Sequence, residues 1–273
     1  MKRAYLIIPA LLGLTYCKSQ FSDGSRRPKE IELIPKTTTY VLASGKPEFD
    51  KALFKAVEEN WTLSPLGDPS DLGARVDLSI ESRSYVSWLA GPLGMIGVLP
   101  GGLHRKKNEV YGPDFAAYAL LSTERAEVNP EQCIYRLPLM IQSLQQAIKG
   151  RTSGEGREKF YAAKEINELT PVLKGKTILV ERALLNEEEI RILDGEHRFR
   201  LEYADRERIE KAIAERSPDE ALMVLIYHQY FDLVIYDLAD RRCVFNGRPK
   251  LGSPEMKLKA SLLKELDKLM YDE

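Results

Sequence analysis

The spacing of apolar residues in the first half of the chain changes from the period of a strand to that of a helix. Residues 38–43 (TTYVLA) are rich in β-branched and aromatic side chains and predict a strand. Pro47 suits the first position of a helix that continues to Trp61, because apolar residues recur at helical spacing after it. Alternation over residues 76–81 then predicts a second strand with one buried face.

Residues 110–150 repeat this order of strand and helix. The run 110–122 predicts a strand, and Asn129 and Pro130 mark the start of a helix. Pro138 should bend or split that helix, because proline cannot donate a main-chain hydrogen bond. The expected buried stripe of this helix consists of Leu137, Ile141, Leu144 and Ile148.

The second half has a more regular pattern. A short amphipathic helix is expected at 157–168, and apolar runs predict strands at 177–180, 199–203 and 221–227 and a hairpin at 231–245. Helical spacing predicts a turn of helix at 187–193, a helix at 206–216 capped by Asp205, and a last helix opened by Ser253 and Pro254. The last helix should bury Leu258, Leu262, Leu266 and Leu269.

This order of elements predicts an α/β fold, with an α+β fold as the alternative, in two small layered halves with mixed sheets. The halves span residues 31–150 and 157–273, and a glycine-, serine- and charge-rich connector at 150–157 separates them. They resemble each other loosely, with helix 48–61 corresponding to helix 205–216.

The most unusual stretch is 86–103 (VSWLAGPLGMIGVLPGGL), which is apolar, uncharged and rich in glycine. It predicts a loop, because glycine and proline weaken a helix. Beside a basic cluster, such a loop suits contact with a membrane or a partner, and the alternative is a loop folded over the protein's own core. The contact residues would be Trp88, Leu93, Met95, Ile96, Arg105, Lys106 and Lys107.

Charge and cysteine content narrow the function classes. The formal charge is −1, which gives no broad field for nucleic acid, so no DNA or RNA partner is expected. Three cysteines are too few for a disulfide framework, and the three scattered histidines give no metal-ligand spacing. Cys133 and Cys243 could form a disulfide in an oxidising compartment, or remain two buried thiols.

Candidate acid–base groups have simpler explanations. Asp194, Glu196, His197 and Asp205 lie close in sequence, but Asp194 precedes a turn glycine and Asp205 has a capping role. His228 lies between two apolar strands and fits a polar turn. The sequence therefore predicts no catalytic residue, no metal and no cofactor.

The first residues have the three parts of an export signal. Lys2 and Arg3 precede an uncharged apolar stretch that ends at Tyr16, and Cys17 follows. A bilayer-spanning helix needs about 20 apolar residues, so this shorter run fits a signal peptide at 1–16.

The Leu14-Thr15-Tyr16-Cys17 segment resembles the cleavage box of bacterial lipoprotein precursors. That resemblance implies lipid attachment at Cys17 with palmitate-type acyl chains. Tyr16 stands where a small residue is usual. The alternatives are ordinary cleavage near Ser19, releasing a soluble protein, or a buried N-terminal helix. Residues 17–30 are polar and predict a flexible tether.

Residues 177–237 also resemble the small α/β modules of envelope lipoproteins in the CsgG and TolB N-terminal class. In both, a strand ends in an acidic–arginine pair, here Asp205-Arg206, and leads into a helix. The resemblance implies an assembly or interaction module rather than an enzyme.

Together these patterns predict a non-catalytic binding, scaffolding or assembly lipoprotein of a bacterial cell envelope. The expected location is the periplasmic side of the outer membrane, with a membrane contact through the lipid and an envelope protein as partner. The alternatives are an envelope hydrolase whose site assembles only in three dimensions, and a soluble secreted or periplasmic carrier of a small ligand.

Overall fold

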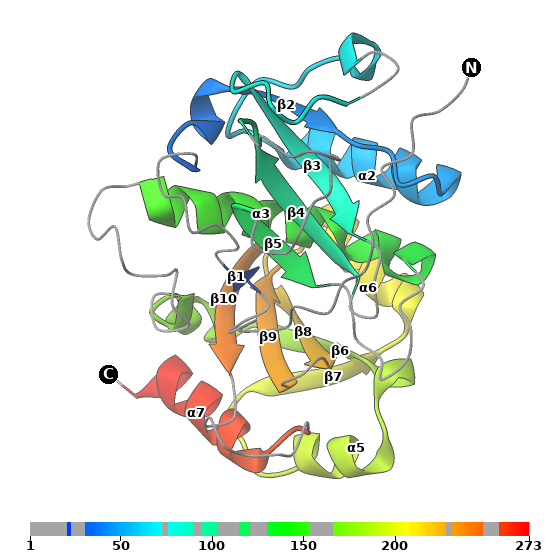
Figure 1. Ribbon diagram of the computed structural model, residues 1–273. Helices are drawn as coiled ribbons and strands as arrows, with labels where there is room; N and C mark the ends of the chain where they lie inside the picture. The colour runs from blue at the N-terminus through cyan, green and yellow to red at the C-terminus, as the bar shows by residue number, and fades with distance from the viewer. Residues whose placement is uncertain are drawn as a thin grey trace. The chain divides into compact units, whose positions relative to one another are not determined.

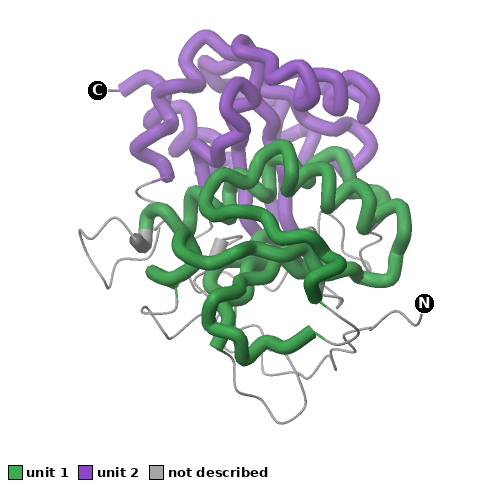
Figure 2. Tube along the Cα trace, turned by 90° about the horizontal axis from the view of Figure 1, so that it is seen from above, with its two compact units in different colours: residues 1–121, 127–160 green, residues 122–126, 161–273 purple. Residues whose placement is uncertain are grey.

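The computed structural model describes residues 21–22, 31–72, 76–89, 94–102, 115–120, 130–152, 166–227, 231–247 and 257–272. The chain is an α/β protein with two five-stranded mixed sheets, which confirms the predicted fold class. It divides into two compact units (Figure 2), residues 1–121 with 127–160 and residues 122–126 with 161–273.

The first unit carries a sheet in the order β1-β5-β4-β3-β2 (Figure 1). Its strands are β1 (Phe21–Ser22), β2 (Thr38–Val41), β3 (Arg83–Leu89), β4 (Met95–Pro100) and β5 (Ala117–Leu120). β2 and β3 are parallel, and the other neighbours are antiparallel.

Two helices, α2 (Pro47–Asn60) and α3 (Leu137–Thr152), pack together on one face of this sheet. The ring centroids of Phe49 in α2 and Trp88 in β3 are 5.1 Å apart. The predicted stripe of α3 is confirmed, because all four of its residues are fully buried. A 3-10 helix, η4 (Pro130–Arg136), precedes α3, so the helix type changes beside Pro138, as a split at the proline predicts.

Three sequence predictions in this unit are wrong. Phe21 and Ser22, expected in a flexible tether, form β1 and pair with β5. Residues 76–80 form turns rather than a strand, and 86–103 contains most of β3 and all of β4 instead of a loop. Glycine is typical of a loop, yet at Gly97 it makes room for an aromatic ring. A Cβ atom there would lie 2.1 Å from the Phe115 ring. Glycine in this strand is therefore a packing requirement.

The parallel pair β2–β3 is joined by buried hydroxyl groups. Thr39 Oγ1 lies 2.7 Å from Ser84 Oγ and 2.5 Å from Ser64 Oγ. Ser84 Oγ is also 2.8 Å from Thr37 Oγ1, which hydrogen-bonds the Ile34 carbonyl. Thr39 and Ser84 are fully buried, so these hydroxyls satisfy one another away from water.

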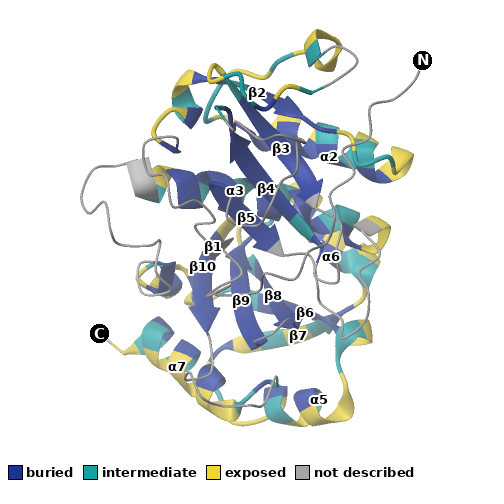
Figure 3. Ribbon diagram, viewed as in Figure 1, coloured by how far each residue is buried: buried dark blue, intermediate teal, exposed yellow. Residues whose placement is uncertain are grey.

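The second unit carries a sheet in the order β10-β9-β8-β6-β7. Its strands are β6 (Thr177–Glu181), β7 (Arg200–Ala204), β8 (Glu220–Tyr227), β9 (Phe231–Asp237) and β10 (Arg242–Gly247). β6 pairs in parallel with β7 and β8, and β8, β9 and β10 pair antiparallel. Every residue of β9 is buried (Figure 3), as expected for a strand covered on both faces.

Helices cover both faces of this sheet. Buried residues of α5 (Glu187–Leu193) and α7 (Ala260–Tyr271) belong to one core cluster with alternate residues of β8 and β9. The buried residues of α6 (Arg206–Glu215) lie outside that cluster, and α6 packs against β6 from the opposite face. Asp205 accepts a hydrogen bond from the Arg208 N–H at 2.8 Å, which confirms its predicted capping role.

The last helix starts later than the sequence suggested. α7 begins at Ala260 rather than at Pro254, and residues 248–256 lie outside the described part. Of the helix expected at 157–168, residues 157–165 also lie outside the described part. Short 3-10 helices occur at η1 (Ile34–Lys36), η2 (Pro69–Leu72), η5 (Thr170–Leu173) and η6 (Arg182–Leu184).

The two units share a framework of strand pairing. The first unit has, in chain order, β2, α2, β3, β4, β5 and α3. The corresponding elements of the second unit, also in chain order, are β6, α6, β8, β9, β10 and α7. In each, the first two of these strands pair in parallel and the following pairs are antiparallel. α2 therefore corresponds to α6, as the loose likeness of the two halves suggested. The second unit adds α5 and β7.

Candidate functional site

The residues expected to contact a membrane or partner are only partly placed by the structure. Trp88 and Ile96 lie in β3 and β4 and are 8% and 0% exposed, so neither side chain is available for a surface contact. Met95, at the start of β4, is half-buried. Cys17, Leu93, Arg105, Lys106 and Lys107 lie outside the described residues.

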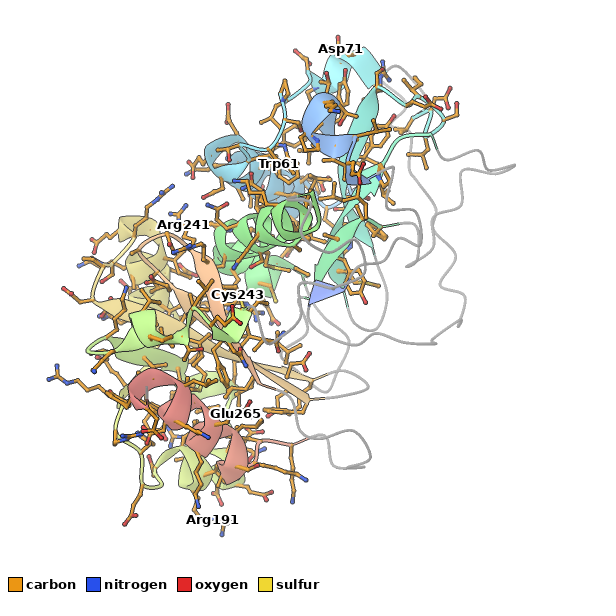
Figure 4. The ribbon with its side chains drawn as sticks, turned by 90° about the vertical axis from the view of Figure 1, so that its left-hand side faces the viewer. Trp61, Asp71, Arg191, Arg241, Cys243 and Glu265 are labelled. Carbon is orange, nitrogen blue, oxygen red and sulfur yellow. The ribbon has the colours of Figure 1, made fainter. Side chains whose placement is uncertain are left out.

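Cys133 and Cys243 are both free, buried thiols, not a disulfide. Each lies inside its own unit, Cys133 in η4 and Cys243 in β10. Cys243 is labelled in Figure 4. Burial raises the pKa of the Cys243 thiol well above its usual range. This cysteine therefore stays protonated and is a poor nucleophile.

The acid–base candidates near residue 197 have structural roles. Both ring nitrogens of His197 lie 2.9 Å from main-chain carbonyls, those of Phe199 and Leu193. The ring also stacks on Phe199, with centroids 3.9 Å apart. Asp205 caps α6, and Asp194 accepts a hydrogen bond from Tyr203. His228 lies outside the described residues.

The carboxyl ends of β6 and β7 form a polar site that the sequence patterns did not reveal. The chain leaves β6 toward α5 on one face and leaves β7 toward α6 on the other. In open α/β sheets, ligands bind at such a change of direction. Here Arg206 fills it, donating from Nε and Nη2 to Glu181 Oε1 at 3.1 and 3.0 Å. Glu181 is 5% exposed and Arg206 is 42% exposed, so a buried carboxylate paired with a partly exposed guanidinium occupies this position.

Tyr203 extends the same edge. Its hydroxyl donates to Asp194 Oδ1 at 2.7 Å, and the Arg182 guanidinium lies 5.4 Å from its ring centroid. Burial, together with the hydrogen bond to the Asp194 carboxylate, raises the pKa of Tyr203 to about 12. At neutral pH this phenol is protonated and acts as a donor that holds α5 against β7.

A buried carboxylate, Glu189, is also committed to structure. Its Oε2 accepts the Asn186 N–H at 2.9 Å, and Asn186 Oδ1 accepts the Glu189 N–H at 3.0 Å, which forms a capping box at the start of α5. Its Oε1 accepts the Tyr227 hydroxyl of β8. The carboxylate therefore ties α5 to the sheet.

Two edges of the sheets are closed by the chain itself. The Thr39 N–H of β2 donates to Pro65 O at 2.8 Å, and the Gly67 N–H donates to Thr39 O at 2.9 Å. In the second unit, Thr170 Oγ1 donates to the Val244 carbonyl of β10 at 2.9 Å, and Asn167 Oδ1 accepts the Asn246 N–H at 2.8 Å. These contacts occupy positions where another strand would pair.

The edge formed by β7 is different. Within the described ranges, its main-chain groups pair only with β6, and no other segment bonds to its outer side. Leu201 and Tyr203 pack partly against the core on the face of α5 and α7. Arg200 and Glu202 are exposed on the opposite face. β7 thus offers main-chain donors and acceptors between one apolar and one charged row.

The described part of the chain contains no helix long and apolar enough to cross a bilayer. It also contains no group of three or more histidine, cysteine, aspartate or glutamate residues arranged to hold a metal ion.

Comparison with known proteins adds no family assignment. The chain matches no protein-family model, no curated protein and no solved structure. The fold defines the class of the protein, an α/β protein of two units with a shared strand framework.

Sequence reasoning missed both the Glu181–Arg206 pair and the open edge. A sequence signal for the ion pair does exist, because Arg206 directly follows a strand and a capping aspartate. The open edge has no such signal, since the apolar period of one strand does not reveal the order of strands in the sheet.

Proposed function

We propose that this protein is a non-catalytic binding or assembly module of a bacterial cell envelope, held at the membrane by a lipid on Cys17. Its docking site is the outer edge of β7. The partner there is a polypeptide that supplies one extended strand, so that main-chain hydrogen bonds give affinity and side-chain rows give specificity.

The observation that carries the docking site is the contrast between edges. β2 and β10 have their outward main-chain groups bonded by residues 65–67 and by Asn167 and Thr170. β7 has no such cover among the described residues. Unpaired edge groups are a template for another strand. Among the described edge strands of four or more residues, β7 is left open, whereas β2 and β10 are closed.

The polar side chains near β7 support a binding role over chemistry. Glu181, Glu189 and Tyr203 each hold a neighbouring element in place through a hydrogen bond or ion pair. These contacts hold α6 to β6, α5 to β8, and β7 to the end of α5. A rigid edge suits strand addition, because little order is lost on binding.

The envelope location rests on the N-terminal pattern. Lys2 and Arg3, the apolar stretch after them and Cys17 form a lipoprotein-like signal. Because Phe21 and Ser22 already belong to β1, the folded body would lie close to a lipid on Cys17 and could meet a partner near the membrane.

The anchor is tested by the mass of the mature N-terminal peptide from envelope fractions. A diacylglycerol adduct on Cys17 is the expected result, and Cys17→Ala should release the protein from membranes. A mature peptide that starts at Gln20 would contradict the anchor.

The docking site is tested by a photo-crosslinking amino acid placed at position 200 or 202 of the full chain in cells. Both side chains are exposed on β7, and Lys211, 67% exposed on α6, is the matched control position. Cross-links to protein are expected from 200 and 202 and not from 211. Absence of cross-links from both β7 positions would overturn the edge as a docking site.

A further inference from the structure

We propose that the strand added to β7 is β7 of a second copy of this chain, paired antiparallel with Leu201 opposite Leu201. This inference rests on the proposed docking role of β7 and names the partner. The two sheets would join into one continuous sheet about a two-fold axis, the commonest symmetry of protein dimers.

The order of charges along β7 supports self-pairing. Arg200 and Glu202 lie on the same exposed face, one residue to either side of Leu201. When Leu201 faces Leu201, antiparallel pairing puts Arg200 of each copy opposite Glu202 of the other. Opposite charges at directly facing positions stabilise an antiparallel pair. The strand is therefore its own complement in charge.

Other registers lose this match. A shift of two residues puts Arg200 opposite Arg200, or Glu202 opposite Glu202, and like charges at facing positions are destabilising. A shift of one residue places Arg200 opposite Leu201 and mixes the charged and apolar faces. Parallel pairing in register puts each arginine beside another arginine. A single arrangement thus satisfies both faces of the strand.

The apolar face of the same strand fits this arrangement. Leu201 and Tyr203 are partly buried against the core of their own unit. Across a two-fold axis at Leu201, the two leucines meet and extend the apolar layer from one copy to the next. Exposed apolar surface on this row would be removed from water, which favours association.

The two charges are available for contacts between copies. Within the described residues, Glu202 has a single ion pair, a long one with Arg208 (3.9 Å between Oε1 and Nε), and the two side chains are 47% and 38% exposed. Arg200 makes no ion pair with any residue in the described ranges. Exposed pairs of this kind contribute little to the fold of one copy, so both groups can exchange partners at small cost.

The test is charge reversal in the full chain, purified from envelope fractions in detergent and analysed by sedimentation velocity over a range of concentrations. The wild type should be a dimer. Arg200→Glu and Glu202→Arg should each weaken dimerisation at least about tenfold, because each places two like-charge pairs across the axis. The double variant should restore the dimer, since the reversed charges again face each other.

Matched controls use the same charge changes on α6. Lys211→Glu and Glu215→Arg alter two residues that are 67% and 62% exposed and lie away from the edge. They should leave the dimer unchanged. Circular dichroism of every variant should match the wild type, since none of the substituted side chains is buried.

Three outcomes separate this inference from the docking role itself. A double variant as weak as the single ones overturns self-pairing in this register. A wild-type monomer that still cross-links from position 202 to a different protein overturns self-pairing and leaves edge docking in place. A monomer without cross-links from 200 or 202 overturns both.

Discussion

In the first unit, the outer side of strand β2 pairs through a single bridge, between Thr39 and Leu66. In the second unit, the outer side of β6 pairs with a whole strand, β7. The strands inside these edges pair in the same way in both sheets. The difference is an added α5 and β7 in the second unit. Main-chain bonds thus close the outer side of β2 in the first unit, whereas the second unit ends in a five-residue edge strand, β7.

The two units also place their polar groups differently. The parallel pair β2–β3 contains buried hydroxyls between its strands, at Thr37, Thr39 and Ser84. The parallel strands of the second unit are apolar inside, and charges pair near their ends, as in Glu181–Arg206 and Lys176–Asp237. Hydrogen bonds between buried hydroxyls join β2 to β3 between the strands. In the second unit, ion pairs join the strands near their ends.

The largest effect is expected from Lys176→Met, which breaks the end pair of the second unit. Lys176 Nζ lies 2.5 Å from Asp237 Oδ1, and the side chains are 13% and 4% exposed. Leaving this carboxylate unpaired should lower the free energy of unfolding by about 3 kcal/mol. Urea denaturation followed by circular dichroism measures the change.

Adding Asp237→Asn should recover much of that loss, since the buried charge is then gone. Lys211→Met, at a 67% exposed position, should change stability by less than about 0.5 kcal/mol. Equal stability of Lys176→Met and wild type would show that the pair does not hold the second sheet.

Thr39→Val tests the hydroxyl bonds of the first unit. Thr39 is fully buried, and its loss removes hydrogen-bond partners of Ser64 and Ser84. The expected cost is about 2 kcal/mol, because buried polar atoms are left unsatisfied. Tryptophan fluorescence reports on this unit, since both tryptophans, Trp61 and Trp88, belong to it.

Thr38→Val is the matched control for this change. Thr38 is only half-buried, and its hydroxyl has no hydrogen bond within the described residues. It should leave the fluorescence transition in place. A transition that moves equally in both variants would contradict a special role for the hydroxyls.

A smaller effect is expected at the corresponding helices α2 and α6. Asp205 caps α6 with its side chain, whereas α2 starts at Pro47 after Lys46, which has no side-chain cap. Asp205→Ala should cost about 1 kcal/mol of stability. Lys46→Ala should cost far less, as measured by urea denaturation. Similar losses in both would argue that the cap contributes nothing to the second unit.

The smallest effect concerns the pH dependence of Tyr203. Its pKa is raised from 10.0 to about 12, so the protonated phenol contributes stability below pH 10 that is lost as the pH rises through 12. Ultraviolet titration should show one tyrosinate signal near pH 12 that is missing in Tyr203→Phe. Asp194→Asn should shift it toward lower pH. An unchanged titration in Asp194→Asn would refute the contact.

Much of the fold follows from short-range pattern. The stripe of α3, the capping of α6 and the apolar strand β8 were predictable, because each depends on residues a few positions apart. The prediction of a loop at 86–103 is wrong because the relevant contact is long-range. Gly97 accommodates Phe115, which lies 18 positions away in sequence, so no local pattern shows that this glycine belongs to a strand.

The candidate site was less accessible still. Whether β7 is an edge depends on the crossover that takes β8 to the other side of β6. The charges Arg200 and Glu202 were visible in the sequence, but their meaning depends on which side of the sheet they face and on what lies next to them. Physical reasoning from one strand cannot supply either fact.

The side-chain cover of β10 has a consequence for synthesis and aggregation. Asn167 and Thr170, which occupy the outer groups of β10, are translated before the strand itself. The strand Arg242–Gly247 contains Cys243, Val244 and Phe245, an apolar run of the kind that aggregates when its edge is bare. Its cover is already present when the strand emerges. Loss of that cover would expose the edge of this apolar run to pairing with other chains.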